Sequence, residues 1–235
     1  NEDLNIVAEW GRMRGQKGDS AVDGDWTGAR VYYVEQDNNL RKINSPVLAE
    51  MEEVDMGDPK HLADFITSAK RRFPAHKYAL FICGHGSGWY YRTPPRGSGD
   101  KGIAFDDGTD NFLDTPGLGR ALKAGGQLDI LFNDSCLLQG VEVLYEVKDS
   151  VKIMMGAENF AYDNDYYALV KRLHAEPDVS PRELSLLILG DYRKYYAGSQ
   201  KAGYDLSAVE TSAAEGLIRR LDKWTALVMR TNDQA

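Results

Sequence analysis

A histidine and a cysteine each follow an apolar run of the kind that forms a buried strand. Residues 78–83 lead into His85, and residues 128–132 lead into Cys136. Ligands of open parallel sheets lie beyond the carboxyl ends of the strands, so such a fold can bring the two side chains together. A thiol can attack a carbonyl carbon, and a neighbouring imidazole can deliver the proton that a leaving amine needs. The pattern therefore predicts Cys136 as a nucleophile and His85 as its acid–base partner.

Glycine and a following helix would assist this chemistry. Gly86 has no Cβ, so its backbone can approach a substrate, and its amide together with that of Cys136 could hold a developing oxyanion. A helix that begins just after Cys136 would favour the thiolate through its N-terminal dipole. Each motif alone has an ordinary explanation, since such a cysteine usually packs in the core and a Gly-His-Gly run usually forms a turn. Their occurrence at matching strand ends favours catalysis.

Strands and helices alternate along the chain, which predicts an α/β fold with a mainly parallel central sheet and helices on both faces. Asp58 before Pro59 is typical of a helix start, and Ser180 to Glu183 form a capping box with proline in the first turn. We expect strands at residues 4–8, 29–34, 78–83, 128–132 and 151–155, and helices from 58, from 115, over 141–147, from about 166, from 180 and over 213–229.

The composition is that of a globular protein and excludes several classes of function. The chain has 235 residues, of which 43% are hydrophobic and 27% charged, and a net charge of −8. Lys and Arg form no basic stripe, so we expect no nucleic-acid partner. No apolar run approaches the ~20 residues of a membrane span, and no signal segment opens the chain. Cys83 and Cys136 are too few for a disulfide framework, and we expect Cys83 to pack as a small hydrophobe.

Four motifs and three following residues occur in an order that points to a known family. The motifs are VDMGDP at 54–59, FPAHKYAL at 73–80, HGSGW at 85–89 and DSCL at 134–137, and Glu142, Tyr145 and Glu146 follow them. Over about residues 4–230, this order resembles the clostripain family of cysteine peptidases, which belongs to the caspase-like clan. Two departures are Ser135, where the family commonly has Ala, and the lack of a family strand and helix ahead of Leu4.

The resemblance implies a fold and an activity. We expect one caspase-like domain over residues 1–235, folded as a three-layer sandwich, that acts as an endopeptidase on peptides or proteins with basic residues. Cleavage would occur after Arg, and cleavage after Lys stays an open alternative. His85 and Cys136 would be catalytic. The family also suggests a secreted or cell-surface bacterial protein. No cofactor is expected, although some relatives depend on calcium, and the run Asp106 to Asp110 resembles a calcium loop only superficially. The oligomeric state stays open.

A pocket for a basic side chain needs carboxylates. Asp134 is the first candidate and corresponds to an Asp that the family uses there. A second is expected after the strand at 151–155, where spacing does not decide between Asp163 and Asp165. The alternative for Asp165 is that it caps the helix that begins near Tyr166.

The connection over residues 90–101 is rich in Pro, Gly and Ser and is expected to be exposed. Relatives are often cut between the histidine and the cysteine, so we expect self-processing after Arg96 or Lys101. The plain alternative is an uncut surface connection.

Other readings of the same residues remain. The chain could be an inactive relative that only binds peptides, or a transpeptidase or ligase on the same scaffold. It could also be a zinc-binding module that uses Cys83, His85 and Cys136, although structural zinc sites usually supply close cysteine pairs. The remaining histidines, His61, His76 and His174, have no partner in sequence and are expected to be surface groups.

Overall fold

A four-stranded sheet forms the centre of the computed structural model, which describes residues 3–15, 23–39, 41–89, 102–162, 164–197 and 204–232. The strand order is β4-β7-β8-β9. The first three strands run parallel, and β9 is antiparallel to β8. The prediction of a mainly parallel sheet is therefore confirmed. The strands are β4 (Ala79–Cys83), β7 (Leu128–Asp134), β8 (Val151–Gly156) and β9 (Ser207–Glu210).

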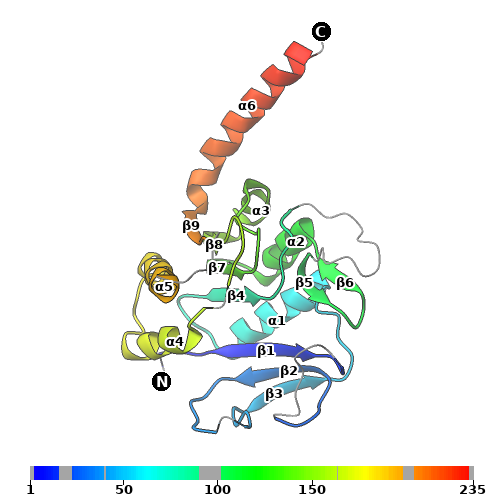
Figure 1. Ribbon diagram of the computed structural model, residues 1–235, viewed down its shortest axis with the longest axis vertical. Coiled ribbons are helices and arrows are strands. Elements are labelled where there is room, and N and C mark those ends of the chain that lie inside the picture. The colour runs from blue at the N-terminus through cyan, green and yellow to red at the C-terminus, as the bar shows by residue number, and fades with distance from the viewer. Residues whose placement is uncertain are drawn as a thin grey trace.

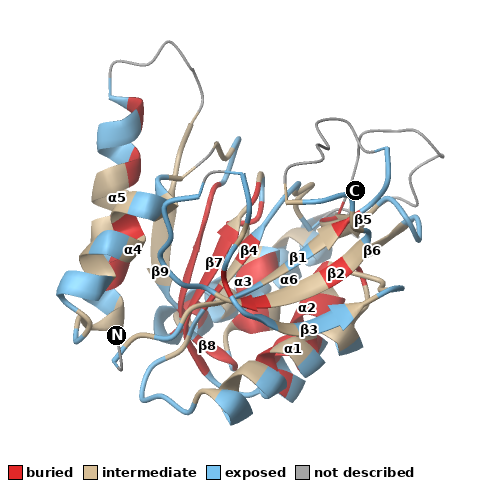
Figure 2. Ribbon diagram, turned by 90° about the horizontal axis from the view of Figure 1, so that it is seen from below, coloured by how far each residue is buried: buried red, intermediate tan, exposed pale blue. Residues whose placement is uncertain are grey.

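Helices cover both faces of this sheet (Figure 1). One face packs against α1 (Pro59–Arg72), α2 (Thr115–Gly125) and α3 (Val141–Val147) through a core that includes Leu131 and Met154. The other face packs against α4 (Tyr166–Ala175) and α5 (Pro181–Tyr196) through a core that includes Phe132 and Met155. Neighbouring residues of one strand point to opposite faces, so β7 and β8 are buried on both sides, as Figure 2 shows.

Side-chain caps explain where the helices begin. The side chain of Asp58 accepts a hydrogen bond from Lys60 N at the start of α1, with Pro59 in the first turn. Ser180 and Glu183 form the predicted capping box at the start of α5. The last helix, α6 (Ala214–Asn232), agrees with the expected 213–229 and projects away from the body of the molecule (Figure 1). Among the described residues, no helix is both long and apolar enough to cross a membrane.

A second, antiparallel sheet lies beneath α1 in Figure 1. It contains β1 (Val7–Arg12), β2 (Gly28–Tyr33) and β3 (Val47–Met51) in that order. The sequence predicted the first two strands with shifted ends and missed β3. It also missed the two-stranded sheet of β5 (Ile103–Asp106) and β6 (Asn111–Leu113). These missed strands are short, and only tertiary pairing distinguishes such segments from loops.

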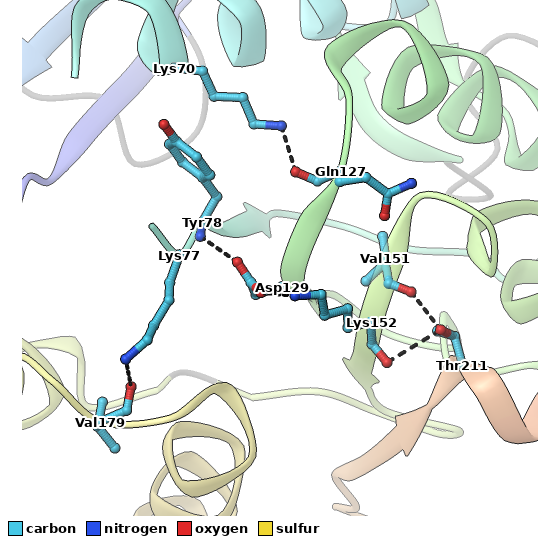
Figure 3. A network of polar contacts seen from close by, with 9 residues as sticks. All are labelled: Lys70, Lys77, Tyr78, Gln127, Asp129, Val151, Lys152, Val179 and Thr211. Atoms are coloured by element: carbon cyan, nitrogen blue, oxygen red, sulfur yellow. Dashed lines mark hydrogen bonds and ion pairs between the residues drawn. The ribbon is translucent and has the colours of Figure 1, made fainter. Parts of the chain in front are cut away.

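A polar network fixes the amino ends of the central strands (Figure 3). Asp129 accepts hydrogen bonds from Tyr78 N and from Lys152 Nζ, each at 2.8 Å. The Thr211 hydroxyl donates to the carbonyl of Val151, and Lys70 Nζ donates to the carbonyl of Gln127 at 2.6 Å. These contacts fix the strand register at one edge of the sheet, while the opposite edge carries the predicted reactive residues.

A hydrogen-bonded pair joins α1 to the antiparallel sheet. His61 Nε2 lies 2.6 Å from Glu9 Oε1. The prediction that His61 is a surface group without a partner is therefore wrong, because the partner comes from a strand far away in the sequence. The hydrogen bond with Glu9 raises the pKa of His61 above its ordinary value, although burial opposes the shift.

This pair should make the stability of the protein depend on pH. A histidine with a raised folded-state pKa contributes fully below its unfolded pKa of about 6.5, and the contribution is lost as the pH rises through the folded pKa. At about pH 5.5, we expect the free energy of unfolding to be up to about 1 kcal/mol higher for wild type than for His61→Gln, and the difference should shrink by about pH 8.5. Denaturant titrations at both pH values measure it, and a constant difference would contradict an ionic contribution.

Candidate active site

The loop that carries His85 packs directly on the loop that carries Cys136. Beyond the paired ends of β4 and β7, Gly84 N donates to Asp134 O at 3.3 Å. A Cβ on Gly86 would lie 2.2 Å from Cys136 O, so only glycine permits this approach. A Cβ on Gly88 would lie 3.2 Å from Leu137 O. The two parallel strands thus bring the loops together at the carboxyl edge of the sheet, and His85 itself is exposed there.

Cys136 sits in a turn that the segment after β8 supports. Leu137 has a φ of 63°, a left-handed conformation that is unusual for a leucine, and its amide donates to Asn159 O at 2.8 Å. The sulfur of the half-buried Cys136 accepts a hydrogen bond from Ala161 N at 3.4 Å. The thiol also lies 3.7 Å from Ala161 O, to which it donates.

The N-terminus of the helix that follows Cys136 lies too far along the chain for its dipole to favour a thiolate at Cys136. The next helix, α3, begins only at Val141, after Gly140 at its N-cap. The helix predicted over 141–147 is thereby confirmed, and an irregular connection separates its N-terminus from Cys136. Any support for a thiolate comes instead from local groups such as the amide of Ala161.

Asp134 is held by Tyr166, the first residue of α4, and by Asn164, which lies just before that helix. Its Oδ1 accepts a hydrogen bond from Asn164 Nδ2 at 2.7 Å, and its Oδ2 accepts one from the Tyr166 hydroxyl. Burial, together with Cys83 and Asp134, raises the pKa of Tyr166 well above its ordinary value. The phenol therefore keeps its proton and acts as the donor.

Sequence reasoning missed Asn164 and Tyr166 as partners of Asp134. Both lie in the polar run after β8 in which the second acid was sought, so the signal was present. The sequence could not show which side chains of that run turn toward β7.

Cys83 lies close to this group without resembling a nucleophile. Its sulfur is 3.3 Å from the Tyr166 hydroxyl. The residue as a whole is exposed, yet desolvation of the thiol raises its pKa, and the hydrogen bond with Tyr166 only partly opposes this shift. A thiol with a raised pKa is a weak nucleophile at neutral pH.

Of the other predicted site residues, the structure describes only Asp165. Asp165 caps α4, because its side chain accepts a hydrogen bond from Ala168 N at 2.9 Å. The alternative of a capping role is thus confirmed, and a role in substrate binding stays a prediction. Asp163, Arg96 and Lys101 lie outside the described residues.

The described residues offer little support for a metal centre. Within those ranges, no group of three or more His, Cys, Asp or Glu side chains could hold a metal ion, which leaves the zinc alternative unsupported. In the segment that resembles a calcium loop, the carboxylate of Asp106 accepts hydrogen bonds from Met56 N and Gly108 N at 2.9 and 2.8 Å. These bonds give that acid a structural role. Calcium dependence stays a prediction.

The fold and the site define an α/β protein that carries a thiol and an imidazole at the carboxyl ends of adjacent parallel strands. Its sequence matches the clostripain family, also called peptidase family C11, over residues 1–235. The chain therefore belongs to the clostripain family, and the resemblance inferred from the motifs is confirmed.

Known proteins resemble this chain in sequence and in structure. Clostripain from Hathewaya histolytica is 29% identical over a match of 160 residues that covers 62% of this chain and 30% of clostripain. A secreted C11 cysteine protease from Bacteroides thetaiotaomicron, solved with an irreversible peptide inhibitor, gives a TM-score of 0.65 at 22% identity over 80% of this chain and 54% of its own. An inactive zymogen C11 protease from Parabacteroides distasonis gives 0.62 at 17% identity over 80% of this chain and 49% of its own.

These similarities confirm the caspase-like α/β sandwich. The chain spans about half of the length of the solved proteins and under a third of clostripain.

Proposed function

We propose that the protein is a cysteine endopeptidase that cleaves peptide bonds after Arg, with Lys as the second candidate. The observation that carries the proposal is the backbone contact between the His85 and Cys136 loops at one edge of the sheet. Membership of the clostripain family supports the same chemistry. A thiol and an imidazole on neighbouring strand ends suit acyl transfer through a covalent intermediate.

In the proposed reaction, His85 takes the proton of the Cys136 thiol as the sulfur attacks the carbonyl carbon of the scissile bond. The resulting imidazolium gives this proton to the leaving amine, and an acyl-enzyme remains on Cys136. His85 then takes a proton from the water that hydrolyses this thioester and returns it to the departing sulfur. The amides of Gly86 and Cys136 would hold the oxyanion. Neither amide donates to an acceptor within the described part of the chain, which supports this proposed role.

Asp134 is the proposed recognition group for the basic side chain. It lies on the same strand end as the nucleophile, and Asn164 and Tyr166 hold its two oxygens in place. An ionised carboxylate in a partly buried position is the partner that Arg and Lys need. The second acid of the pocket would be Asp163 or Asp165.

A panel of fluorogenic peptides tests the proposed activity. Substrates that differ only in Arg, Lys, Asp, Asn or Ala before the cleaved bond should rank Arg first, then Lys, with little turnover of the others. Hydrolysis of none would favour the alternative of an inactive relative that binds peptides.

Asp134→Asn should weaken cleavage after Arg by about 2–4 kcal/mol in kcat/KM, because the bound cation loses its charged partner. Cleavage after an uncharged residue should change much less. The matched control is Asp129→Asn, a buried acid at the other end of the same strand that bonds Tyr78 N and Lys152. This control should lower stability and leave the ratio of Arg to neutral cleavage unchanged. An equal loss on both substrate types for Asp134→Asn would show that this acid supports the fold instead.

We also propose that the protein cuts itself within residues 90–101, after Arg96 or Lys101. The support is the family membership and the basic residues between His85 and Cys136 in sequence. On denaturing gels, wild type should separate into a lighter N-terminal and a heavier C-terminal fragment, while Cys136→Ala stays intact. Wild type that remains one chain while it hydrolyses Arg substrates would show that the cut is not needed for activity.

A further inference from the structure

A cluster of buried polar side chains lies beneath the turn that carries Cys136. Asn133 is 0% exposed, Ser135 1% and Gln139 8%. Neither amide atom of Asn133 has a hydrogen-bond partner in the protein, and the same holds for Ser135 Oγ, Gln139 Oε1 and Ser207 Oγ. Among the described residues, this is a concentration of unpaired polar atoms in an otherwise apolar interior.

The members of this cluster approach one another around Gly156 at the end of β8. A Cβ on Gly156 would lie 3.0 Å from Gln139 Oε1 and 3.6 Å from Asn133 Cβ. Gly156 pairs with Ser207 of β9, and Gln139 Nε2 donates to Ser207 O at 3.3 Å. Ser135 comes two residues after Asn133, just beyond the end of β7.

Such a cluster is unfavourable unless something completes its hydrogen bonds. A buried polar group without a partner costs about 1–3 kcal/mol, and buried polar groups in native proteins are nearly always paired with protein or with ordered water. The cluster offers three neutral side-chain oxygens and one amide group and carries no formal charge. Water, which donates and accepts equally well, matches this set better than an ion does.

We infer that Asn133, Ser135, Gln139 and Ser207 form an internal water-binding site that holds the nucleophile turn in place. Ser135 and Gln139 flank Cys136, Leu137 and Leu138, and Leu137 has the left-handed φ of 63°. A backbone conformation of this kind persists only where its surroundings impose it. From outside, Asn159 and Ala157 accept hydrogen bonds from Leu137 N and Gln139 N. The bound water would hold the same turn from inside, with Asn133 as a positioning residue.

A high-resolution crystal structure of the wild-type protein tests the site directly. We expect at least one ordered water within hydrogen-bond distance of Asn133 and of one further member of the cluster. Direct bonds among the four side chains, with no water between them, would overturn the inference.

The positioning role is tested by the reactivity of Cys136 with iodoacetamide in a Cys83→Ala background. Asn133→Leu keeps a similar volume and removes the water ligands, so the rate of alkylation should fall by about tenfold as the turn loosens. In Asn133→Ser, which keeps a hydroxyl, the rate of alkylation should fall less. This variant also serves as the test if the leucine variant does not fold. Thr115→Val is the control, because it removes another buried hydroxyl without a partner, in α2. This control should not change the rate, and an unchanged rate in both Asn133 variants would overturn the positioning role.

The consequence for turnover rests on the proposed peptidase activity. There, Asn133→Leu should lower kcat by a similar factor and leave KM near its wild-type value, because the pocket is not touched. Alkylation requires no substrate, so it reports on the water site even if the protein hydrolyses no peptide. If alkylation slows in the Asn133 variants but wild type hydrolyses no peptide, the result contradicts the proposed function and not the water site.

Discussion

Cys136→Ala should abolish hydrolysis of Arg-containing peptides and leave the protein folded. The substitution removes the sulfur that forms the acyl-enzyme, and no other group in the described site can replace it. The side chain is only half-buried and loses a single heavy atom, so the free energy of unfolding should change by on the order of 1 kcal/mol. Initial rates with a fluorogenic substrate, together with a thermal melt, measure both quantities.

The other cysteine supplies the control for this experiment. Cys83→Ala also removes a thiol at the carboxyl edge of the sheet, but from a side chain whose raised pKa makes it a poor nucleophile. It should keep most of the activity. If Cys136→Ala kept a tenth of the wild-type rate or more, Cys136 would not be the nucleophile.

His85→Ala should lower kcat/KM by about 10²–10⁴-fold, the contribution typical of a general acid or base. The side chain is exposed, so its loss should not affect thermal stability. His76→Ala removes another exposed histidine, outside the site, and should match wild type in both measurements. A His85→Ala variant with nearly full activity would reduce His85 to a turn residue, and the leaving amine would then need another proton donor.

Much of the central architecture could be predicted from the sequence, because its signals are local. The strands around residues 80, 130 and 153 are mostly apolar runs, which suit parallel strands buried on both faces. Asp58 and Ser180 are explicit helix caps with proline in the first turn, and both helices begin where these residues indicate. The placement of the His85 and Cys136 loops also follows from local signals, since both residues come just after such strands.

The features that sequence reasoning missed depend on contacts between distant parts of the chain. The partner of His61 is Glu9, and Asp134 is bonded by Tyr166 from another layer of the fold. No periodicity reports such pairs. The helix over 141–147 lies where the sequence predicts it, but no local signal sets the course of the irregular segment after Cys136. Its actual course is imposed by hydrogen bonds to Asn159 and Ala157.

The segment that follows β8 touches both the proposed nucleophile and the proposed recognition group. Ala161 contacts the sulfur of Cys136, while Asn164 and Tyr166 bond the carboxylate of Asp134. The surroundings of the two proposed groups are therefore connected through this one segment. A ligand that shifts this segment by binding at Asp134 would change the environment of the sulfur, and a ligand bound at the sulfur would in turn change the affinity at Asp134. The position of one short segment would thus affect both substrate recognition and the reactivity of the sulfur.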